Sequence, residues 1–258
     1  MRKVNLTLPH SWEELTAKQL LFISSLFLQG LTKDGFLTKA FIYLSGLRIL
    51  PGRYGDNGNP VYLFKLRKGP AFPLSTCEIK DFCQECNFLL EEREGFKPLP
   101  KLAGRRAREV MMYDACFGEF VAAMVYHNQF KDLEQDKRFL YKLCAVMYPA
   151  GKWNPDNNKE DRFAHVPIQA CYTAFLWFGT VMNMVARECP DLFRNVSEEG
   201  EPVSLRENIH AMYNLTTGSD ITKEKEISGI EMWRVLYDMD EKARRIKETN
   251  ERLEHGSI

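Results

Sequence analysis

The chain has 258 residues, of which 45% are hydrophobic, and its 35 Lys and Arg balance its 35 Asp and Glu. A chain of this length can bury one large core or two smaller ones, so we expect one or two globular domains. The zero formal net charge excludes a global attraction to nucleic acid or to an anionic membrane. Glu13, Glu14 and Lys18 interrupt the amino-terminal segment before any long apolar run, which argues against a secretory signal peptide.

Seven cysteines lie at long spacings along the chain. An odd number of cysteines, in a chain too large to depend on disulfides, favours free thiols in a reducing compartment. We therefore expect a cytoplasmic protein.

The first third of the chain predicts a small β element among helices. Alternating apolar and polar residues at 3–8 predict a strand, and Val61 to Leu66 predicts a second strand. Because residues 51–60 are rich in turn-forming residues, we expect a hairpin that joins the amino-terminal strand in a small antiparallel sheet. Within this third, three serine or threonine residues have Glu or Gln three positions later, the spacing of a capping box: Ser11, Thr16 and Ser75.

Apolar residues recur at helical spacing through most of the chain. The predicted helices run over residues 17–29, 36–47, 79–93, 110–130, 133–147, 166–189 and 229–253, with a short helix after Ser204. The predicted fold class is therefore mainly α, helical bundle-like, with a small antiparallel β element near the amino terminus. An acidic loop near residue 200 divides the predicted domains, which are a mainly helical body at 1–194 and a carboxy-terminal helical arm at 203–258.

The segment from Val166 to Ala186 carries no formal charge and is long enough to cross a bilayer. Its polar side chains fall on one narrow helical face together with Arg187. A helix surrounded by lipid is not expected to have such a polar face. A central helix of a helical protein buries its apolar majority and leaves one edge for water or a polar partner. We favour the central helix over the membrane span.

Three cysteines near residue 80 resemble part of a zinc site. However, Cys83 and Cys86 share an apolar helical stripe with Phe82 and Leu89, and no second paired-cysteine cluster follows in the sequence. We favour core thiols, with Cys77 outside the stripe.

Asp156, Asn158 and Glu160 have the spacing of a calcium-binding loop. Asp161 stands where that loop needs glycine, and Pro167 stands where it needs a bidentate glutamate. We therefore expect no calcium site.

The sequence contains no glycine-rich phosphate loop and no nucleophile elbow, and its five histidines stand singly. We expect a protein without catalytic residues, cofactor or metal. A catalytic site assembled from scattered polar residues is the remaining enzymatic hypothesis.

A basic run occupies segment 97–108 without an intervening acid: Lys97, Lys101, Arg105, Arg106 and Arg108. Such a run can bind phosphates. A solvated loop that balances the acids at 91–94 explains it as well, and the run lacks interleaved aromatic residues.

The last predicted helix is strongly charged but carries a thin apolar stripe with Trp233 beside it. The stripe either packs against the rest of the chain or binds a partner. If it binds a partner, the contact residues are predicted to be Met232, Trp233, Leu236 and Met239.

Several short segments of the chain resemble a mainly helical protein family of Bacteroidetes phages and prophages. These segments are residues 8–16 (LPHSWEELT), 117–120 (FGEF), 148–149 (YP), 153–156 (WNPD), 220–224 (DITKE) and 232–233 (MW). The resemblance covers most of the chain and assigns no catalytic residue.

This resemblance implies a non-enzymatic role in virion morphogenesis, such as a tail assembly chaperone that binds the tape measure protein in the cytoplasm of the bacterial host. The alternative is a nucleic-acid-associated protein of a mobile element that uses segment 97–108. The expected partner is another protein, such as a phage tail or tape measure protein, and no membrane contact is expected.

Overall fold

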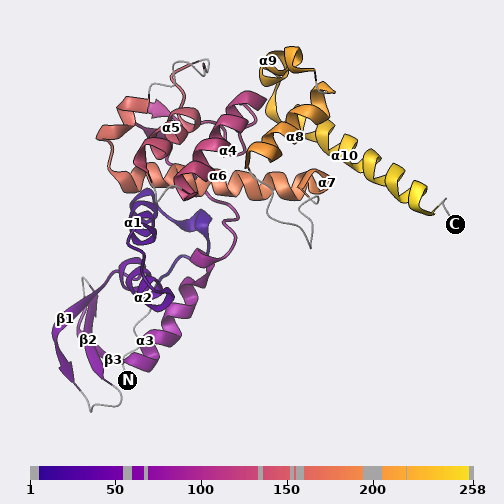
Figure 1. Ribbon diagram of the computed structural model, residues 1–258. Helices are drawn as coiled ribbons and strands as arrows, with labels where there is room; N and C mark the ends of the chain where they lie inside the picture. The colour runs from indigo at the N-terminus through magenta and orange to yellow at the C-terminus, as the bar shows by residue number, and fades with distance from the viewer. Residues whose placement is uncertain are drawn as a thin grey trace. The chain divides into compact units, whose positions relative to one another are not determined.

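The computed structural model describes residues 6–54, 60–66, 69–132, 136–151, 154, 160–193, 205–218 and 220–255 (Figure 1). The chain forms two compact units, residues 1–97 and residues 98–258. This division lies inside the predicted body at 1–194. The predicted arm at 203–258 forms no unit of its own, because its helices pack against those of residues 117–193.

The predicted fold class is confirmed. Helices dominate the described residues, and a small antiparallel sheet lies near the amino terminus. Its three strands are β1 (Leu47–Tyr54), β2 (Val61–Leu66) and β3 (Ala71–Ser75), with β2 in the middle.

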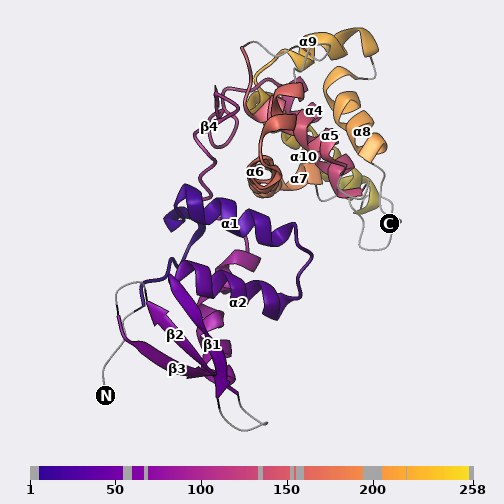
Figure 2. The ribbon, with the colours of Figure 1, turned by 90° about the vertical axis from the view of Figure 1, so that its left-hand side faces the viewer.

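The first unit places helices beside this sheet (Figure 2). Its helical elements are η1 (Trp12–Glu14), α1 (Ala17–Phe27), α2 (Lys33–Leu44), α3 (Thr76–Cys83) and η2 (Gln84–Leu90). The predicted capping boxes at Thr16 and Ser75 are present, because each hydroxyl accepts a hydrogen bond from the backbone three residues later. Gly30 follows α1 with a φ of +59°, the left-handed conformation that glycine adopts without strain.

The strand predicted at Val61–Leu66 is present as β2, but its partners differ from the prediction. β2 pairs with β1 and β3. Residues 6–8 lie outside the strands, and the rest of the predicted amino-terminal strand lies outside the described residues. β1 was not predicted, because its second half lies in the segment that is rich in turn-forming residues. The strand continues through Pro51 and Gly52, since an edge strand tolerates proline.

The second unit opens with a β pair that the sequence did not predict. β4 (Lys101–Leu102) and β5 (Arg105–Arg106) are joined by a two-residue turn. Ala103 and Gly104 both have positive φ in this turn, as a type I′ hairpin requires.

The rest of the second unit is helical. Its elements are α4 (Phe117–Asp132), α5 (Lys137–Met147), η3 (Glu160–His165), α6 (Ile168–Glu188), α7 (Pro190–Phe193), α8 (Leu205–Thr217), η4 (Ile221–Lys223), α9 (Glu224–Ser228) and α10 (Met232–His255). The helix predicted from Val110 begins only at Phe117. The backbone from Val110 to Cys116 is not helical. Here the carbonyls of Val110 and Met111 accept hydrogen bonds from the indoles of Trp177 and Trp233.

α6 is a central helix of this unit and packs against α4, α5 and α7. Trp177 and Phe178 are fully buried on it. On its polar face, Asn183 and Arg187 are exposed at the carboxy-terminal end, whereas Thr173 is buried and donates a hydrogen bond to the carbonyl of Ala170 (2.7 Å). Within the described residues, no helix combines the length and apolar character needed to cross a bilayer.

Candidate functional site

The carboxy-terminal helix α10 begins as an integral part of the second unit. The backbone just before it pairs with the backbone that precedes α4, through an antiparallel bridge between Cys116 and Glu231. The amide of Phe117 donates to the carbonyl of Ile230 (2.8 Å), and the amide of Met232 donates to the carbonyl of Ala115 (3.0 Å). These contacts fix the register of α10 against α4.

The structure buries the residues predicted to bind a partner. Met232, Leu236 and Met239 are fully buried, and Trp233 is 3% exposed. The Trp233 indole donates a hydrogen bond to the Met111 carbonyl (2.8 Å), so its polar edge is also satisfied within the unit. The stripe therefore packs against the rest of the second unit, which is one of the two interpretations that the sequence left open. A partner cannot contact these four side chains while α10 stays in place.

A second connection holds the middle of α10. The carboxylate of Asp240 accepts hydrogen bonds from the amides of Asp191 (2.8 Å) and Leu192 (2.9 Å) in α7. An acidic side chain at the start of a helix satisfies amides that lack partners within that helix. α10 is therefore tied to α7 as well as to α4 as far as residue 240.

Beyond Ala243, the apolar stripe of α10 continues but becomes exposed. Ile246 is 52% exposed and Leu253 is 65% exposed, whereas Met239 and Ala243 are buried. Spacings of three or four residues place Ile246, Asn250 and Leu253 on the face that Met239 and Ala243 begin. We call residues 244–255 the distal segment of α10, and its apolar face lacks the cover that the proximal half has.

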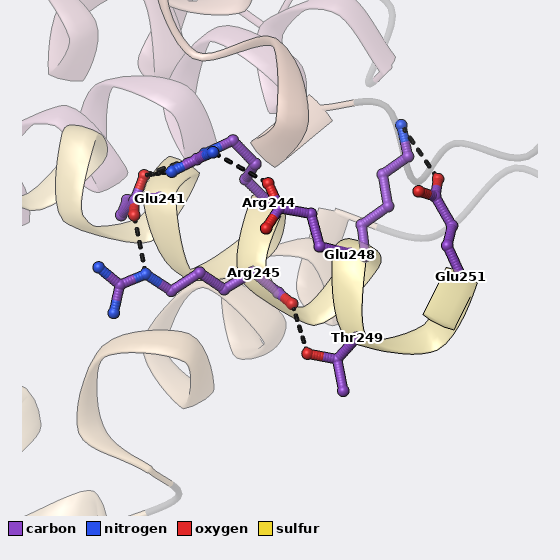
Figure 3. Close-up of polar contacts among 7 residues, drawn as sticks. Glu241, Arg244, Arg245, Glu248, Thr249 and Glu251 are labelled. Carbon is purple, nitrogen blue, oxygen red and sulfur yellow. Dashed lines mark hydrogen bonds and ion pairs between the residues drawn. The ribbon is translucent and has the colours of Figure 1, made fainter. Parts of the chain in front are cut away.

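The distal segment is stabilised by ion pairs along its own surface (Figure 3). Arg244 bridges Glu241 (2.6 Å) and Glu248 (2.9 Å), and Arg245 also pairs with Glu241 (2.7 Å). Hydrogen bonds from the two arginines lower the pKa of the Glu241 carboxyl. Pairs at this spacing support a helix that has little tertiary packing.

The residues predicted from the sequence to contact a partner lie at the buried start of this helix, and Leu253 was not among them. The signal was present in the sequence, since the three-and-four spacing of the stripe extends to Leu253. Sequence periodicity gives the face of a helix, but it does not reveal where neighbouring helices stop covering that face.

The basic run at 97–108 is divided between the two units, and two of its four cations in the second unit are buried. Lys97 belongs to the first unit and pairs with Glu13 (2.9 Å). Arg108 is buried in the second unit, where it pairs with the buried carboxylate of Glu119 and donates to the carbonyl of Val146 (2.9 Å). The interpretation of the run as a solvated loop is therefore wrong for Arg108.

Arg105 is also buried, with 8% of its surface exposed, and its guanidinium lies over the ring of Phe163 (5.5 Å to the centroid). Burial lowers the pKa of Arg105, and the positive charge of Arg162 lowers it further. Only Lys101 and Arg106 of the run are left exposed in the second unit. The surface available for a nucleic acid is thus much smaller than the sequence indicated.

Of the predicted cysteine stripe, Cys83, Cys86 and Leu89 lie in the core of the first unit, whereas Phe82 is 41% exposed. Cys83 and Cys86 are buried, whereas Cys77 is exposed. Burial raises the pKa of the Cys86 thiol to about 12, so this thiol stays protonated at neutral pH. Among the described residues, no group of His, Cys, Asp and Glu has a geometry that could hold a metal ion.

Asp156 and Asn158, which have the calcium-like spacing with Glu160, lie outside the described residues. His127 stacks on Phe175 (4.2 Å between centroids). Comparison of the chain with protein-family models, with curated proteins and with solved structures found no match.

Proposed function

We propose that this protein acts by protein–protein contact, without catalysis, and that the distal segment of α10 is its binding element. The observation that supports this proposal is the exposed continuation of a buried apolar stripe at Ile246 and Leu253. A helix that is apolar on one face and charged elsewhere can dock in a groove of a partner and remain soluble when free. The ion pairs of Arg244 and Arg245 support this helix before it is bound, which reduces the ordering cost of binding.

The resemblance to phage and prophage proteins suggests the kind of partner. We propose a morphogenesis factor for a phage tail, acting as a tail assembly chaperone that holds the tape measure protein in the cytoplasm of the bacterial host. The free thiols of the buried cysteines suit that reducing compartment.

The experiment is a binding measurement between the purified protein and a tape measure protein encoded by a neighbouring gene. The double variant Ile246→Ser/Leu253→Ser removes the exposed stripe without touching the core. Ile221→Ser is the matched control, because Ile221 is 73% exposed elsewhere in the same unit. We expect the double variant to keep its thermal unfolding midpoint and lose binding, and the control to keep both.

Unchanged binding by the double variant would remove the distal segment from the interface. Absence of binding by the unaltered protein would remove the tape measure protein as its partner.

The nucleic-acid alternative depends on the exposed cations Lys101 and Arg106. Two phosphate contacts would give only a shallow dependence of affinity on salt concentration. Lys101→Gln/Arg106→Gln should abolish binding to duplex DNA if this alternative holds. If the unaltered protein shows no salt-dependent DNA binding, the alternative is excluded.

A further inference from the structure

The first unit contains a cavity of about 520 Å³ between its sheet and its helices. The wall is formed by α2, by α3 with the start of η2, and by β1 and β2. Its apolar lining comes from all of these walls except η2: Leu37, Ile42, Ile49, Phe64 and Ile79. This volume is within the range of cavities that hold small organic ligands.

The inner wall of the cavity carries no charge at neutral pH. Cys83 lines it and donates a hydrogen bond to the hydroxyl of Thr38 (3.8 Å). Burial raises the pKa of Cys83, and the charge of Asp34 raises it further, so the thiol is neutral. An apolar part of a ligand would therefore meet apolar or neutral groups along this wall.

The charged lining residues are Lys33, Lys80 and Asp34, and all three are exposed. In the part of the chain that the structure describes, neither lysine forms an ion pair. Lys33 is also the first residue of α2, where the helix dipole adds positive potential. The exposed side of the cavity thus carries an excess of one positive charge, with two ammonium groups free to bind an anion.

We propose that this cavity binds a small amphipathic monoanion, with an apolar chain along Leu37, Phe64 and Ile79 and a carboxylate at Lys33 and Lys80. This chemistry matches the two parts of the lining. A neutral apolar molecule would leave both ammonium groups unused, and a cation would be repelled by them. The site lies in the first unit, so it is separate from the distal segment of α10 and independent of the function proposed above.

The direct test is isothermal titration of the full-length protein with decanoate, decanol and decyltrimethylammonium. These probes share an apolar chain and differ in the charge of the head group. We expect one decanoate per chain, with decanol bound more weakly and the cation most weakly. Equal affinity for all three, or no decanoate binding, would overturn the proposal.

The lysines are tested with Lys33→Gln/Lys80→Gln. We expect the affinity for decanoate to fall about three- to tenfold, as expected for two exposed charge pairs, and the affinity for decanol to stay constant. Lys65→Gln is the matched control, since Lys65 is an exposed lysine of β2 that does not line the cavity. An equal loss in the control would assign the effect to overall charge and contradict the site.

The position of the ligand is tested at Ile49, which lines the cavity and is 52% exposed, so that substitution there spares the core. Ile49→Glu and Ile49→Lys remove the same apolar contact and add opposite charges. We expect Ile49→Glu to bind decanoate more weakly than Ile49→Lys. Identical affinities of these two variants would show that the anion binds elsewhere.

Discussion

The guanidinium of Arg108 pairs with the carboxylate of Glu119 in the interior of the second unit, where both side chains are almost fully buried. Arg108 also donates to the carbonyls of Val146 (2.9 Å) and Asp114 (3.1 Å), and Glu119 accepts from the amide of Cys116 (2.8 Å). The pair therefore connects the segment before α4 to the end of α5. It is a structural element of the unit rather than a phosphate-binding feature.

We predict that Glu119→Gln destabilises the second unit by about 3 kcal/mol, because it leaves the buried charge of Arg108 with only the half-exposed carboxylate of Asp114 (3.3 Å) as its counter-charge. Urea unfolding followed by circular dichroism measures this change. The double variant Arg108→Met/Glu119→Leu should be less destabilised than Glu119→Gln, because it removes both charges. Lys97→Gln, which breaks an exposed pair, is the control and should have a much smaller effect.

Two truncations should separate the two halves of α10. A chain that ends at Gly218 lacks Met232, Trp233, Leu236 and Met239, all of which are buried. Loss of these core side chains should prevent the second unit from folding, because each large buried residue contributes a few kcal/mol. A chain that ends at Arg245 keeps the core and should retain the unfolding midpoint of the full chain.

Calorimetry of both truncated chains measures this difference. A cooperative unfolding transition of the second unit in the shorter chain would contradict the central position of α10.

The two serines with capping-box spacing should differ in their contribution to stability. The Ser75 hydroxyl accepts from the amide of Glu78, whereas the Ser11 side chain forms no cap hydrogen bond. Ser75→Ala should therefore cost about 1 kcal/mol of stability, and Ser11→Ala should be close to neutral. Chemical denaturation of both variants measures the free energy of unfolding. Similar losses of stability in the two variants would show that the cap hydrogen bond of Ser75 does not cause the loss.

The helicity of the distal segment should depend on pH through Glu241. Its folded-state pKa is lowered by hydrogen bonds from Arg244 and Arg245, so its contribution to helix stability is complete above the unfolded pKa of about 4.3. That contribution is lost as the pH falls through the lower folded pKa. Cα chemical shifts of residues 241–252, recorded from neutral to acidic pH, should show this loss.

Glu241→Gln should remove this part of the pH dependence. A measured pKa of Glu241 at or above the usual glutamate value would contradict the arrangement in Figure 3.

Local sequence signals predicted the local structure well. The capping boxes at Thr16 and Ser75, the central helix around Trp177 and strand β2 are all present, because each depends on residues close together in the sequence. The pairing partners of β2 were predicted less well, since pairing depends on which strands meet in space. Thr16 and Ser11 have the same spacing to a possible capping partner, and only the structure distinguishes them.

Long-range contacts explain the rest of the differences. The charged run at 97–108 looked solvated because Glu119, the partner of Arg108, is remote from most of the run and lies within an apolar helix. The cover over the start of α10 comes from α4, α7 and α8, and periodicity within α10 carries no information about those helices. The cavity of the first unit combines α2, α3 and the sheet, so no single motif in the sequence indicated it.

The bridge between Cys116 and Glu231 joins two segments that are far apart in the sequence. During synthesis, the residues that begin α4 leave the ribosome long before the strand-like partner at Glu231 and the indole of Trp233 exist. Until α10 has been synthesised, part of the apolar surface of the helices from α4 to α8 is uncovered. Chains with uncovered apolar surface tend to aggregate. The rate of translation through residues 220–240 should therefore influence the yield of folded protein.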